Sequence, residues 1–282
     1  MQLDGTTKLL GIFGDPIAHS LSPRMQNAAI EASAINAVYV PFHVSAENLG
    51  HAVAAIRTFN MVGVNVTVPH KEGVIPFLDE IDPAASMIGA VNTIVNRDGI
   101  LVGYNTDAIG FLDSLRTELS FTPAGKNVVL LGAGGAARAA VVALSQAGAR
   151  YITICNRTFK KAEGLRNEFS GQFPQTGFAV EPLEAEKMNP SLSHADLLVN
   201  TTAVGLHGES FSLPLIEELP SGAVLYDMVY NAGLTPLQQA AADRGVPFAD
   251  GRGMLAGQGE EAFRLWFNIR PAPGIMRSVI AK

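Results

Sequence analysis

Cysteine, long apolar runs and clusters of basic residues are scarce in this sequence of 282 residues. Its one cysteine, Cys155, excludes an internal disulfide and favours a reducing compartment. No stretch is long and apolar enough to span a bilayer, and the first residues lack the basic and apolar regions of a secretory signal. The net charge is −6 and no Lys/Arg-rich run is present, which argues against nucleic-acid binding. These absences predict a cytoplasmic protein that binds neither membranes nor nucleic acid.

Metal-ligand spacing is also absent. None of the six histidines belongs to a pattern such as H-E-x-x-H, and there is no second cysteine. We therefore expect no bound metal.

Apolar residues, by contrast, are plentiful and regularly arranged: hydrophobic residues make up 48% of the chain and charged residues 16%. Short apolar runs such as Leu9–Phe13 and Asn127–Leu131 alternate with helix-period stretches such as Pro23–Ala34 and Gly135–Ala147. This alternation predicts an α/β fold with mainly parallel sheets. The C-terminal segment has a helical pattern over Gln258–Asn268 and no strand pattern, so it must pack on a unit built by earlier residues.

A glycine-rich stretch directly follows a buried strand and opens a helix. Its pattern is G-x-G-x-x-A, in which Gly132 permits a tight turn, Gly134 allows close approach of a ligand and Ala137 allows close helix–strand packing. The helix N-terminus offers N–H groups and a positive dipole end to phosphates. We predict that this stretch holds the pyrophosphate of a dinucleotide used for hydride transfer, through Gly132, Ala133, Gly134, Gly135, Ala136 and Ala137.

The end of the next predicted strand indicates which dinucleotide is bound. An NAD site usually has an acidic residue there for the ribose 2′-hydroxyl. This chain has Asn156, Arg157 and Thr158 instead, followed by Lys161. Arg157, Thr158 and Lys161 are suited to hold a 2′-phosphate by charge-assisted hydrogen bonds, although the same bases would also suit a solvated helix start. We predict NADP.

Polar residues interrupt apolar runs in the N-terminal half. In a strand predicted over 61–68, Asn65 and Thr67 would share one face opposite three valines, and Lys71 follows. His70 would line the same pocket. Polar groups at a strand end suit a ligand pocket.

Further polar groups come from two loops and a second apolar run: Ser20, Ser22, Asn92 and Asp107. Ser22 is equally suited to cap the helix that begins near Pro23, and Asp107 is suited to cap the helix after it.

Eight segments together resemble the shikimate dehydrogenase family. They follow one another in the family's order: Gly14–Pro23, Asn65–Lys71, Gly89–Thr93, Asn105–Asp107, Gly132–Arg138, Asn156–Thr158, Asp227–Asn231 and Gly253–Gly259.

The resemblance implies a two-domain α/β protein. A substrate-binding domain would span residues 1–107, a doubly wound, Rossmann-like NADP domain 108–247, and C-terminal helices over 248–282 would return to the substrate domain. The implied reaction is the reversible NADPH-dependent reduction of 3-dehydroshikimate to shikimate, in the pathway to aromatic amino acids. The sequence does not decide between a monomer and a homodimer.

The resemblance also implies roles for particular residues. Lys71 and Asp107 would be the catalytic pair, because an alkoxide formed by hydride addition needs a proton that a positioned lysine can donate. Substrate contacts would come from Ser20, Ser22, Asn65, Thr67, Lys71, Asn92, Asp107, Tyr230 and Gln258.

Two alternatives remain. The segments Ser20–Asn27 and Gly103–Asp107 also resemble family members that oxidise quinate as well as shikimate, some of them with NAD. A non-catalytic ligand sensor could use the same fold, but the intact Lys71 and Asp107 argue against it.

Overall fold

The computed structural model describes residues 3–183 and 190–281, which form two compact units. Unit 1 comprises residues 1–110 and 255–282, and unit 2 comprises residues 111–254. The chain passes from one unit to the other inside two helices, α4 (Asp107–Leu119) and α8 (Arg252–Phe267). The expected two-domain α/β architecture is therefore confirmed, including the return of the C-terminal helices to the first unit.

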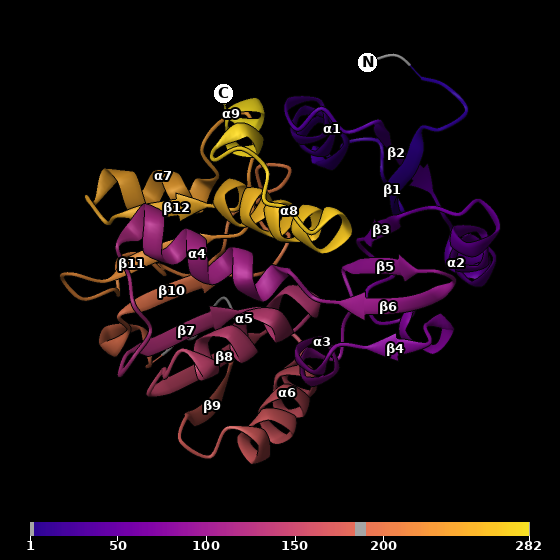
Figure 1. Ribbon diagram of the computed structural model, residues 1–282. Helices are drawn as coiled ribbons and strands as arrows, with labels where there is room; N and C mark the ends of the chain where they lie inside the picture. Colours follow the sequence, from indigo (N-terminus) through magenta and orange to yellow (C-terminus); the bar gives the residue numbers. More distant parts are fainter. Residues whose placement is uncertain (1–2, 184–189, 282) are drawn as a thin grey trace. The chain divides into compact units, whose positions relative to one another are not determined.

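Unit 1 contains a mixed sheet of six described strands (Figure 1). Their order is β2-β1-β3-β5-β6-β4. The strands are β1 (Lys8–Gly14), β2 (Ala37–His43), β3 (Gly63–Val66), β4 (Glu80–Ile81), β5 (Thr93–Arg97) and β6 (Ile100–Tyr104). Strand β5 runs antiparallel to both of its neighbours, so this sheet is less uniformly parallel than the sequence predicts.

Helices cover both faces of this sheet. The helices that lie wholly in unit 1 are α1 (Ser22–Ala32), α2 (Leu49–Thr58), α3 (Pro83–Ile88) and α9 (Ile275–Ile280). Leu10 and Ile12 of β1 point into one core cluster, with residues of α1, α8 and α9, whereas Phe13 points into a second cluster with α2 and α3. This division follows from the alternation of side chains along a strand.

The C-terminal segment fills much of the first cluster. Phe263, Trp266 and Met276 are buried there against α1 and the sheet. Helix α8 begins earlier than the sequence predicts, and the short helix α9 was not predicted.

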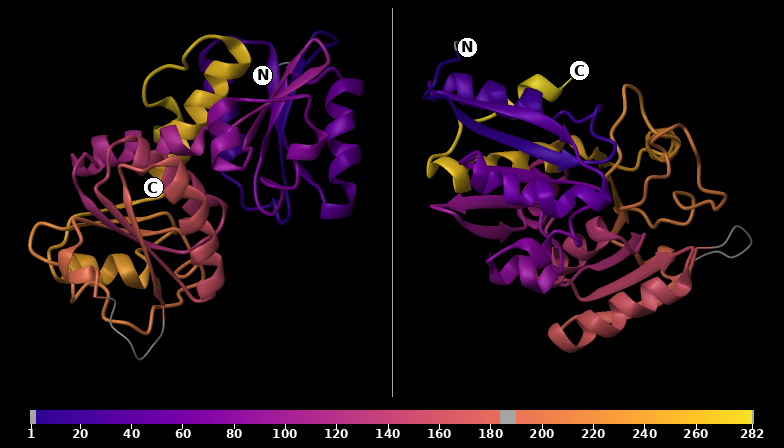
Figure 2. Two further views of the ribbon diagram at one scale, coloured as in Figure 1. Left: turned by 90° about the horizontal axis from the view of Figure 1, so that it is seen from below. Right: turned by 90° about the vertical axis from the view of Figure 1, so that its right-hand side faces the viewer.

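Unit 2 contains a fully parallel sheet of six described strands (Figure 2). The strands are β7 (Asn127–Leu131), β8 (Tyr151–Asn156), β9 (Gly177–Pro182), β10 (Leu197–Asn200), β11 (Val224–Asp227) and β12 (Phe248–Asp250). The helices are α5 (Gly135–Gln146), α6 (Phe159–Gln172) and α7 (Pro236–Asp243), together with most of α4. The order β9-β8-β7-β10-β11-β12 is that of a doubly wound dinucleotide-binding sheet.

In the described part of the chain, no helix is long and apolar enough to cross a membrane. Among these residues, no group of three or more His, Cys, Asp or Glu side chains is placed to hold a metal ion.

Candidate active site

The predicted polar residues of unit 1 follow or precede strands at one edge of its sheet. Strands β1, β3 and β6 all end at this edge, and the antiparallel β5 begins there. Lys71 lies after β3, Asn92 immediately before β5 and Asp107 just after β6. Residues far apart in sequence thus converge because the strand directions bring their connecting segments together.

Lys71 and Asp107 form an ion pair at this edge. The Lys71 Nζ lies 2.6 Å from the Asp107 Oδ2, and the two side chains are 21% and 7% exposed. The second carboxylate oxygen, Oδ1, accepts a hydrogen bond of 2.9 Å from the Asn92 Nδ2. The carboxylate therefore holds an amine on one side and an amide on the other, in a largely dehydrated position where both interactions are strengthened.

Main-chain groups fix both partners of the Asp107 carboxylate. The Lys71 carbonyl accepts a hydrogen bond of 2.8 Å from the Val91 N–H. The Asn92 Oδ1 accepts one of 2.9 Å from the Thr106 N–H. Helix α4 does not need Asp107 as a cap, because the Asn105 Oδ1 accepts the Asp107 N–H at 3.0 Å. Both oxygens of the carboxylate are thus left for Lys71 and Asn92.

The strand predicted over 61–68 is shorter in the structure. Strand β3 ends at Val66, and the His70 N–H closes a turn onto the Thr67 carbonyl at 2.9 Å. Val68 is 67% exposed, so it does not share the buried face of Val64 and Val66, and that prediction was wrong. Pro69 has no N–H for a strand ladder, which is consistent with the early end of β3.

The side chain of His70 bonds to the main chain of Val44. It is buried, and its Nε2 lies 2.6 Å from the Val44 carbonyl oxygen. The ring therefore ties the segment that carries Lys71 to the end of β2.

Ser20, Ser22 and Gln258 also belong to unit 1, but no described contact joins them to Lys71 or Asp107. Ser22 is not the cap that the sequence allowed: Leu21 occupies the N-cap of α1, without a side-chain hydrogen bond. The Ser20 Oγ accepts the Ser22 N–H at 3.3 Å. Gln258, on α8, donates from Nε2 to the Leu255 carbonyl at 2.8 Å.

Tyr230 lies in unit 2, in the segment that follows β11. Burial raises the pKa of its hydroxyl above the ordinary value, while the charge of Arg252 acts in the opposite direction. The phenol is therefore a neutral donor at neutral pH.

In unit 2 the glycine-rich turn connects β7 to α5. It lies beside the end of β10, the strand that pairs with β7 where the strand order reverses. Gly132 has a φ of +111°, and a Cβ there would lie 2.5 Å from the Thr201 Oγ1. Gly134 is the N-cap of α5 and has no side chain with which to cap the helix. A Cβ on Gly134 or Gly135 would meet open space. The first N–H groups of a helix lack intrahelical partners. A turn that only glycine tolerates thus leads into an accessible helix N-terminus, as the pattern predicts.

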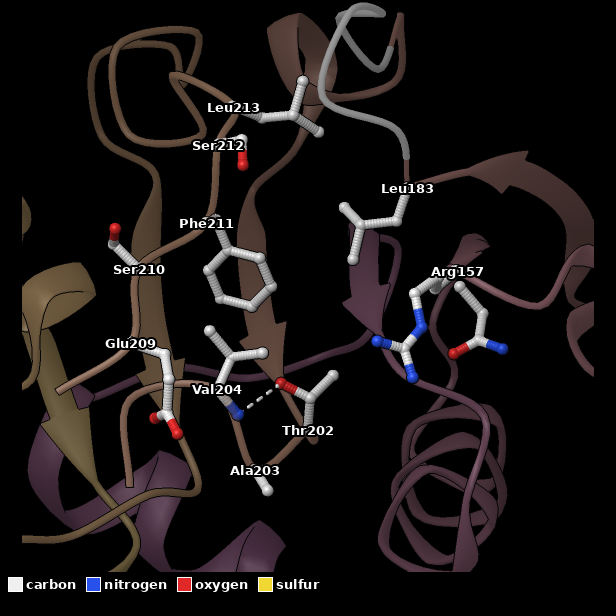
Figure 3. Close-up of a pocket in the computed structure, with 11 residues that line it drawn as sticks. Arg157, Leu183, Thr202, Ala203, Val204, Glu209, Ser210, Phe211, Ser212 and Leu213 are labelled. Carbon is white, nitrogen blue, oxygen red and sulfur yellow. Dashed lines mark hydrogen bonds between the residues drawn. The ribbon is translucent and has the colours of Figure 1, made fainter. Parts of the chain in front are cut away.

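A cavity of about 490 Å³ lies beside the C-terminal ends of β8 and β10 (Figure 3). Arg157 points into it from one side, and Val204 and Phe211 lie on the other. Asn156 also lines the cavity, and its Nδ2 donates to the Thr158 carbonyl at 2.9 Å. Thr158 and Lys161 are exposed side chains at the start of α6, outside this lining.

A carboxylate stabilises the loop on the far side of this cavity. Hydrogen bonds from main-chain N–H groups, that of His207 first, hold the pKa of Glu209 below its ordinary value. The donor distances are 2.9 Å from His207 and 3.2 Å from Gly205. On the same loop, the Val204 N–H donates to the Thr202 Oγ1 at 3.1 Å (Figure 3).

Four further residues have no marked role in the sequence pattern: Thr202 and Val204 line the cavity, and Thr93 and Thr106 bond to Asn92. The first two directly follow a buried strand at the point where the order of a doubly wound sheet reverses, which is where ligands bind in such sheets. Thr93 and Thr106 fall within two of the segments that resemble the family, but their bonds to Asn65 and Asn92 join separate parts of the chain, so no local pattern gave them a role.

Family models match most of the chain. The one described as the shikimate dehydrogenase substrate binding domain matches residues 12–94. The model described as shikimate / quinate 5-dehydrogenase matches residues 116–206, and that described as the shikimate 5′-dehydrogenase C-terminal domain matches 251–280.

Individual relatives match over nearly their whole length. The shikimate dehydrogenase (NADP(+)) of Geobacter metallireducens is 48% identical, over 98% of this chain and 97% of its own. The structure of the Thermus thermophilus shikimate 5-dehydrogenase with NADP(H) and shikimate is 36% identical, with a TM-score of 0.85, and covers 97% of this chain and 98% of its own. The ligand-free 5-ketofructose reductase of a Gluconobacter species is 34% identical, with a TM-score of 0.88 and 98% of each chain covered.

Proposed function

The chain belongs to the shikimate dehydrogenase family, and from this premise we propose that it catalyses the reversible reduction of 3-dehydroshikimate to shikimate with NADPH. The reaction belongs to the biosynthesis of aromatic amino acids. We propose unit 1 as the substrate-binding part and unit 2 as the cofactor-binding part.

The observation that carries the proposal is the ion pair of Lys71 and Asp107. Reduction of a ketone turns its oxygen into a hydroxyl, which requires a proton. The Lys71 ammonium is the donor, and Asp107 holds it in place at 2.6 Å and stabilises its charge. In the oxidation of shikimate the amine takes the proton back. A positioned acid–base group of this kind contributes roughly 10²- to 10⁴-fold to rate.

Shikimate itself offers a carboxylate and several hydroxyls. We propose that Ser20 and Ser22 bind the carboxylate and that Thr67, Gln258 and the Lys71 pair bind hydroxyls. Ser22 is suited to this role because its hydroxyl does not cap α1. We also propose Tyr230, whose phenol is a neutral donor, as a substrate contact.

Two of the proposed substrate contacts have few hydrogen-bonding positions left for a ligand. The Asn65 Nδ2 donates to the Asn92 carbonyl and to the Thr93 hydroxyl, and the Asn92 Nδ2 donates to Thr106 and Asp107. Both side chains are almost fully buried. We therefore propose that Asn65 touches the substrate through the remaining lone pair of its Oδ1. The Asn92 Oδ1 already accepts from the Thr93 hydroxyl and the Thr106 N–H, so we propose that Asn92 bonds to the substrate by exchanging one of these partners.

We propose that unit 2 binds the dinucleotide, and NADPH held there would supply the hydride. We propose that the Gly132–Ala137 stretch holds the pyrophosphate at the N-terminus of α5, where a Cβ on Gly134 or Gly135 would occupy open space. Arg157, Thr158 and Lys161 hold the 2′-phosphate. The Asn156 side chain stabilises the turn that carries them by donating to the Thr158 carbonyl. The absence of an acidic residue at this strand end favours NADP over NAD.

The test follows the consumption of NADPH in the presence of 3-dehydroshikimate, with the product identified by chromatography against authentic shikimate. We expect stoichiometric formation of shikimate. Binding of 3-dehydroshikimate without turnover would instead support a ligand sensor and contradict the proposal.

Quinate is a second candidate substrate, because the model that matches residues 116–206 is described as shikimate / quinate 5-dehydrogenase. Quinate has the same carboxylate and hydroxyl classes, so the groups proposed for shikimate would also recognise it. The relation to a 5-ketofructose reductase shows that the fold alone does not fix the substrate.

We propose a cytoplasmic location, because the single cysteine is buried and no disulfide depends on an oxidising compartment. The net charge of −6 gives no reason to expect nucleic acid as a partner. A homodimer is the alternative to a monomer, and the molar mass in solution distinguishes them.

A further inference from the structure

A continuous line of hydrogen bonds runs through the core of unit 1 to the Asp107 carboxylate. It begins at the Tyr39 hydroxyl, which lies 2.7 Å from the Asn65 Oδ1. The Asn65 Nδ2 lies 3.0 Å from the Thr93 Oγ1, which in turn lies 3.0 Å from the Asn92 Oδ1. The line ends where the Asn92 Nδ2 meets the Asp107 Oδ1 at 2.9 Å.

The direction of each bond is set by groups that can act in only one way. The Asn92 carbonyl can only accept, so the atom of Asn65 that faces it at 3.1 Å is Nδ2. The Asn65 Oδ1 is then the atom facing Tyr39, and the phenol donates. The Thr106 N–H can only donate, so the atom of Asn92 that faces it is Oδ1, at 2.9 Å.

The Thr93 hydroxyl has two possible acceptors, the Asn92 Oδ1 at 3.0 Å and the Thr106 Oγ1 at 3.5 Å, and the shorter contact is the better hydrogen bond. The hydroxyl accepts a hydrogen from the Asn65 Nδ2 and donates its own to the Asn92 Oδ1. Every donor in the line therefore points from Tyr39 toward Asp107. Hydrogen bonds aligned in this way polarise one another, so a donor at the start strengthens the last donor on the carboxylate.

Tyr39 is held rigidly at the start of this line. Its main-chain N–H donates to the Asn27 Oδ1 at 2.9 Å, and its carbonyl accepts from the Asn27 Nδ2 at 2.8 Å. Its ring centroid lies 5.9 Å from that of Trp266, and the residue is 1% exposed. Burial raises the pKa of Tyr39 well above its ordinary value, which keeps the phenol protonated and able to donate.

We infer that Tyr39 and Thr93 are positioning residues for the reaction. They act through Asn65 and Asn92 to hold the Asp107 carboxylate in place beside Lys71. The inference rests on the proposed function. Neither residue touches the ion pair itself. Both act through Asn65 and Asn92, which we also propose as substrate contacts, so the loss of either should lower turnover more than it weakens substrate binding.

The kinetic test compares Tyr39→Phe with a matched control, Tyr226→Phe. Tyr226 is also fully buried and donates one hydrogen bond, of 2.8 Å, to the Ser114 Oγ, but it belongs to unit 2 and takes no part in this line. We expect Tyr39→Phe to lower kcat about three- to tenfold, the equivalent of one hydrogen bond, with the KM for shikimate changed less than about twofold. Tyr226→Phe should retain the wild-type kcat.

Thr93 provides an independent variant in the same line. Thr93→Val removes the hydroxyl and should lower kcat by a similar factor, whereas Thr93→Ser keeps the hydroxyl and should restore it. Because each change interrupts the same line, the double variant Tyr39→Phe/Thr93→Val should be no slower than the slower single variant. Unchanged kcat in Tyr39→Phe, or independent losses that multiply in the double variant, would overturn the inference.

A spectroscopic measurement separates this inference from the proposed function. The side-chain amide signals of Asn92 in a ¹⁵N-labelled protein report its hydrogen bonds whether or not shikimate is turned over. We expect them to shift in Tyr39→Phe and to stay in place in Tyr226→Phe. A wild-type protein that does not turn over shikimate would contradict the proposed function alone. An Asn92 amide signal that does not shift in Tyr39→Phe would contradict this inference.

Discussion

Lys71 is the residue on which the proposed chemistry depends most. Its ammonium has a single charged partner in the described contacts, Asp107, which lies at 2.6 Å. We expect Lys71→Ala to lower kcat by roughly 10²- to 10⁴-fold, the usual contribution of a positioned acid–base group.

The fold should survive this change. Lys71 is partly exposed, and its main-chain carbonyl, which accepts from Val91, is kept in alanine. Circular dichroism and the Kd for NADPH serve as controls. Turnover near the wild-type value in a folded Lys71→Ala variant would remove Lys71 from its proposed role.

Arg157 is the corresponding residue for the cofactor. We expect Arg157→Ala to raise the Kd for NADPH by about ten- to a hundredfold, the range for loss of a charge-assisted hydrogen bond to phosphate. The Kd for NADH should change little, because NADH has no 2′-phosphate. Fluorescence titration with each nucleotide measures both values.

Arg166→Ala is the control for this pair of titrations. Arg166 lies further along α6 and bonds to the Asn167 side chain. It should leave both Kd values unchanged. If Arg157→Ala weakened the binding of NADPH and of NADH equally, Arg157 would not be in contact with the 2′-phosphate.

At the scale of elements, Asp227 joins the ends of β10 and β11 to the start of α7. Its carboxylate accepts hydrogen bonds from the Asn200 Nδ2 at 2.8 Å, the Thr235 Oγ1 at 2.7 Å and the Gln238 Nε2 at 3.0 Å. Burial raises the pKa of Asp227, and these donors offset the rise only in part.

This raised pKa gives the stability of unit 2 a defined pH dependence. The folded chain holds the Asp227 proton more tightly than the unfolded chain does, so the group stabilises the fold below its unfolded pKa of 3.8. That contribution is lost as the pH rises through the folded pKa. Lowering the pH from about 7 to about 4 should therefore raise the Tm of the wild type relative to that of Asp227→Asn.

Other carboxylates contribute equally to the pH dependence of Tm in the wild type and in Asp227→Asn, so their effects cancel in the difference between the two Tm values. Asp79, whose pKa is lowered by hydrogen bonds from the Leu101 N–H and from Arg57, is one of them. A difference in Tm that stays constant over this pH range would contradict the assignment to Asp227.

The elements that the sequence predicts well are those with strong local signals. Strand β7, the Gly132 turn and helix α5 were all predictable, because an apolar run, a glycine pattern and a helical period follow directly on one another. Strand β3 was predicted too long because the alternation of valines continues past Val66, where the chain turns.

The site was predictable in its residue types but not in its connections. Lys71, Asn92 and Asp107 could be named from polar groups in apolar surroundings, yet their contact depends on β5 running antiparallel between β3 and β6. Tyr39 gave no signal, because a tyrosine in a β-rich run is usual and its partner Asn65 lies on another strand.

At the scale of the whole molecule, the chain leaves unit 1 in α4 and returns to it in α8. Phe263 and Trp266 complete a core cluster whose other members come from the first hundred residues and from the end of the chain. Unit 1 therefore depends on its C-terminal segment for its stability.

This dependence can be measured at Phe263, which is fully buried. We expect Phe263→Ala to lower the free energy of unfolding by about 3–5 kcal/mol, the usual effect of removing a buried phenylalanine ring. Trp266 is the only tryptophan in the sequence and lies in unit 1, so urea unfolding followed by its fluorescence reports on that unit.

Phe159→Ala is the matched control for this measurement. Phe159 is 40% exposed, at the start of α6 in unit 2. It should leave the unfolding midpoint of unit 1 unchanged. A loss in Phe263→Ala as small as that in the control would show that the C-terminal helix does not stabilise unit 1.

We propose that unit 1 binds shikimate beside Lys71 and that unit 2 selects NADP over NAD. The most direct test measures kcat/KM by nicotinamide absorbance for shikimate and quinate, each with NADP and with NAD. We expect the highest kcat/KM for shikimate with NADP. A higher value for quinate with NAD would contradict the proposal.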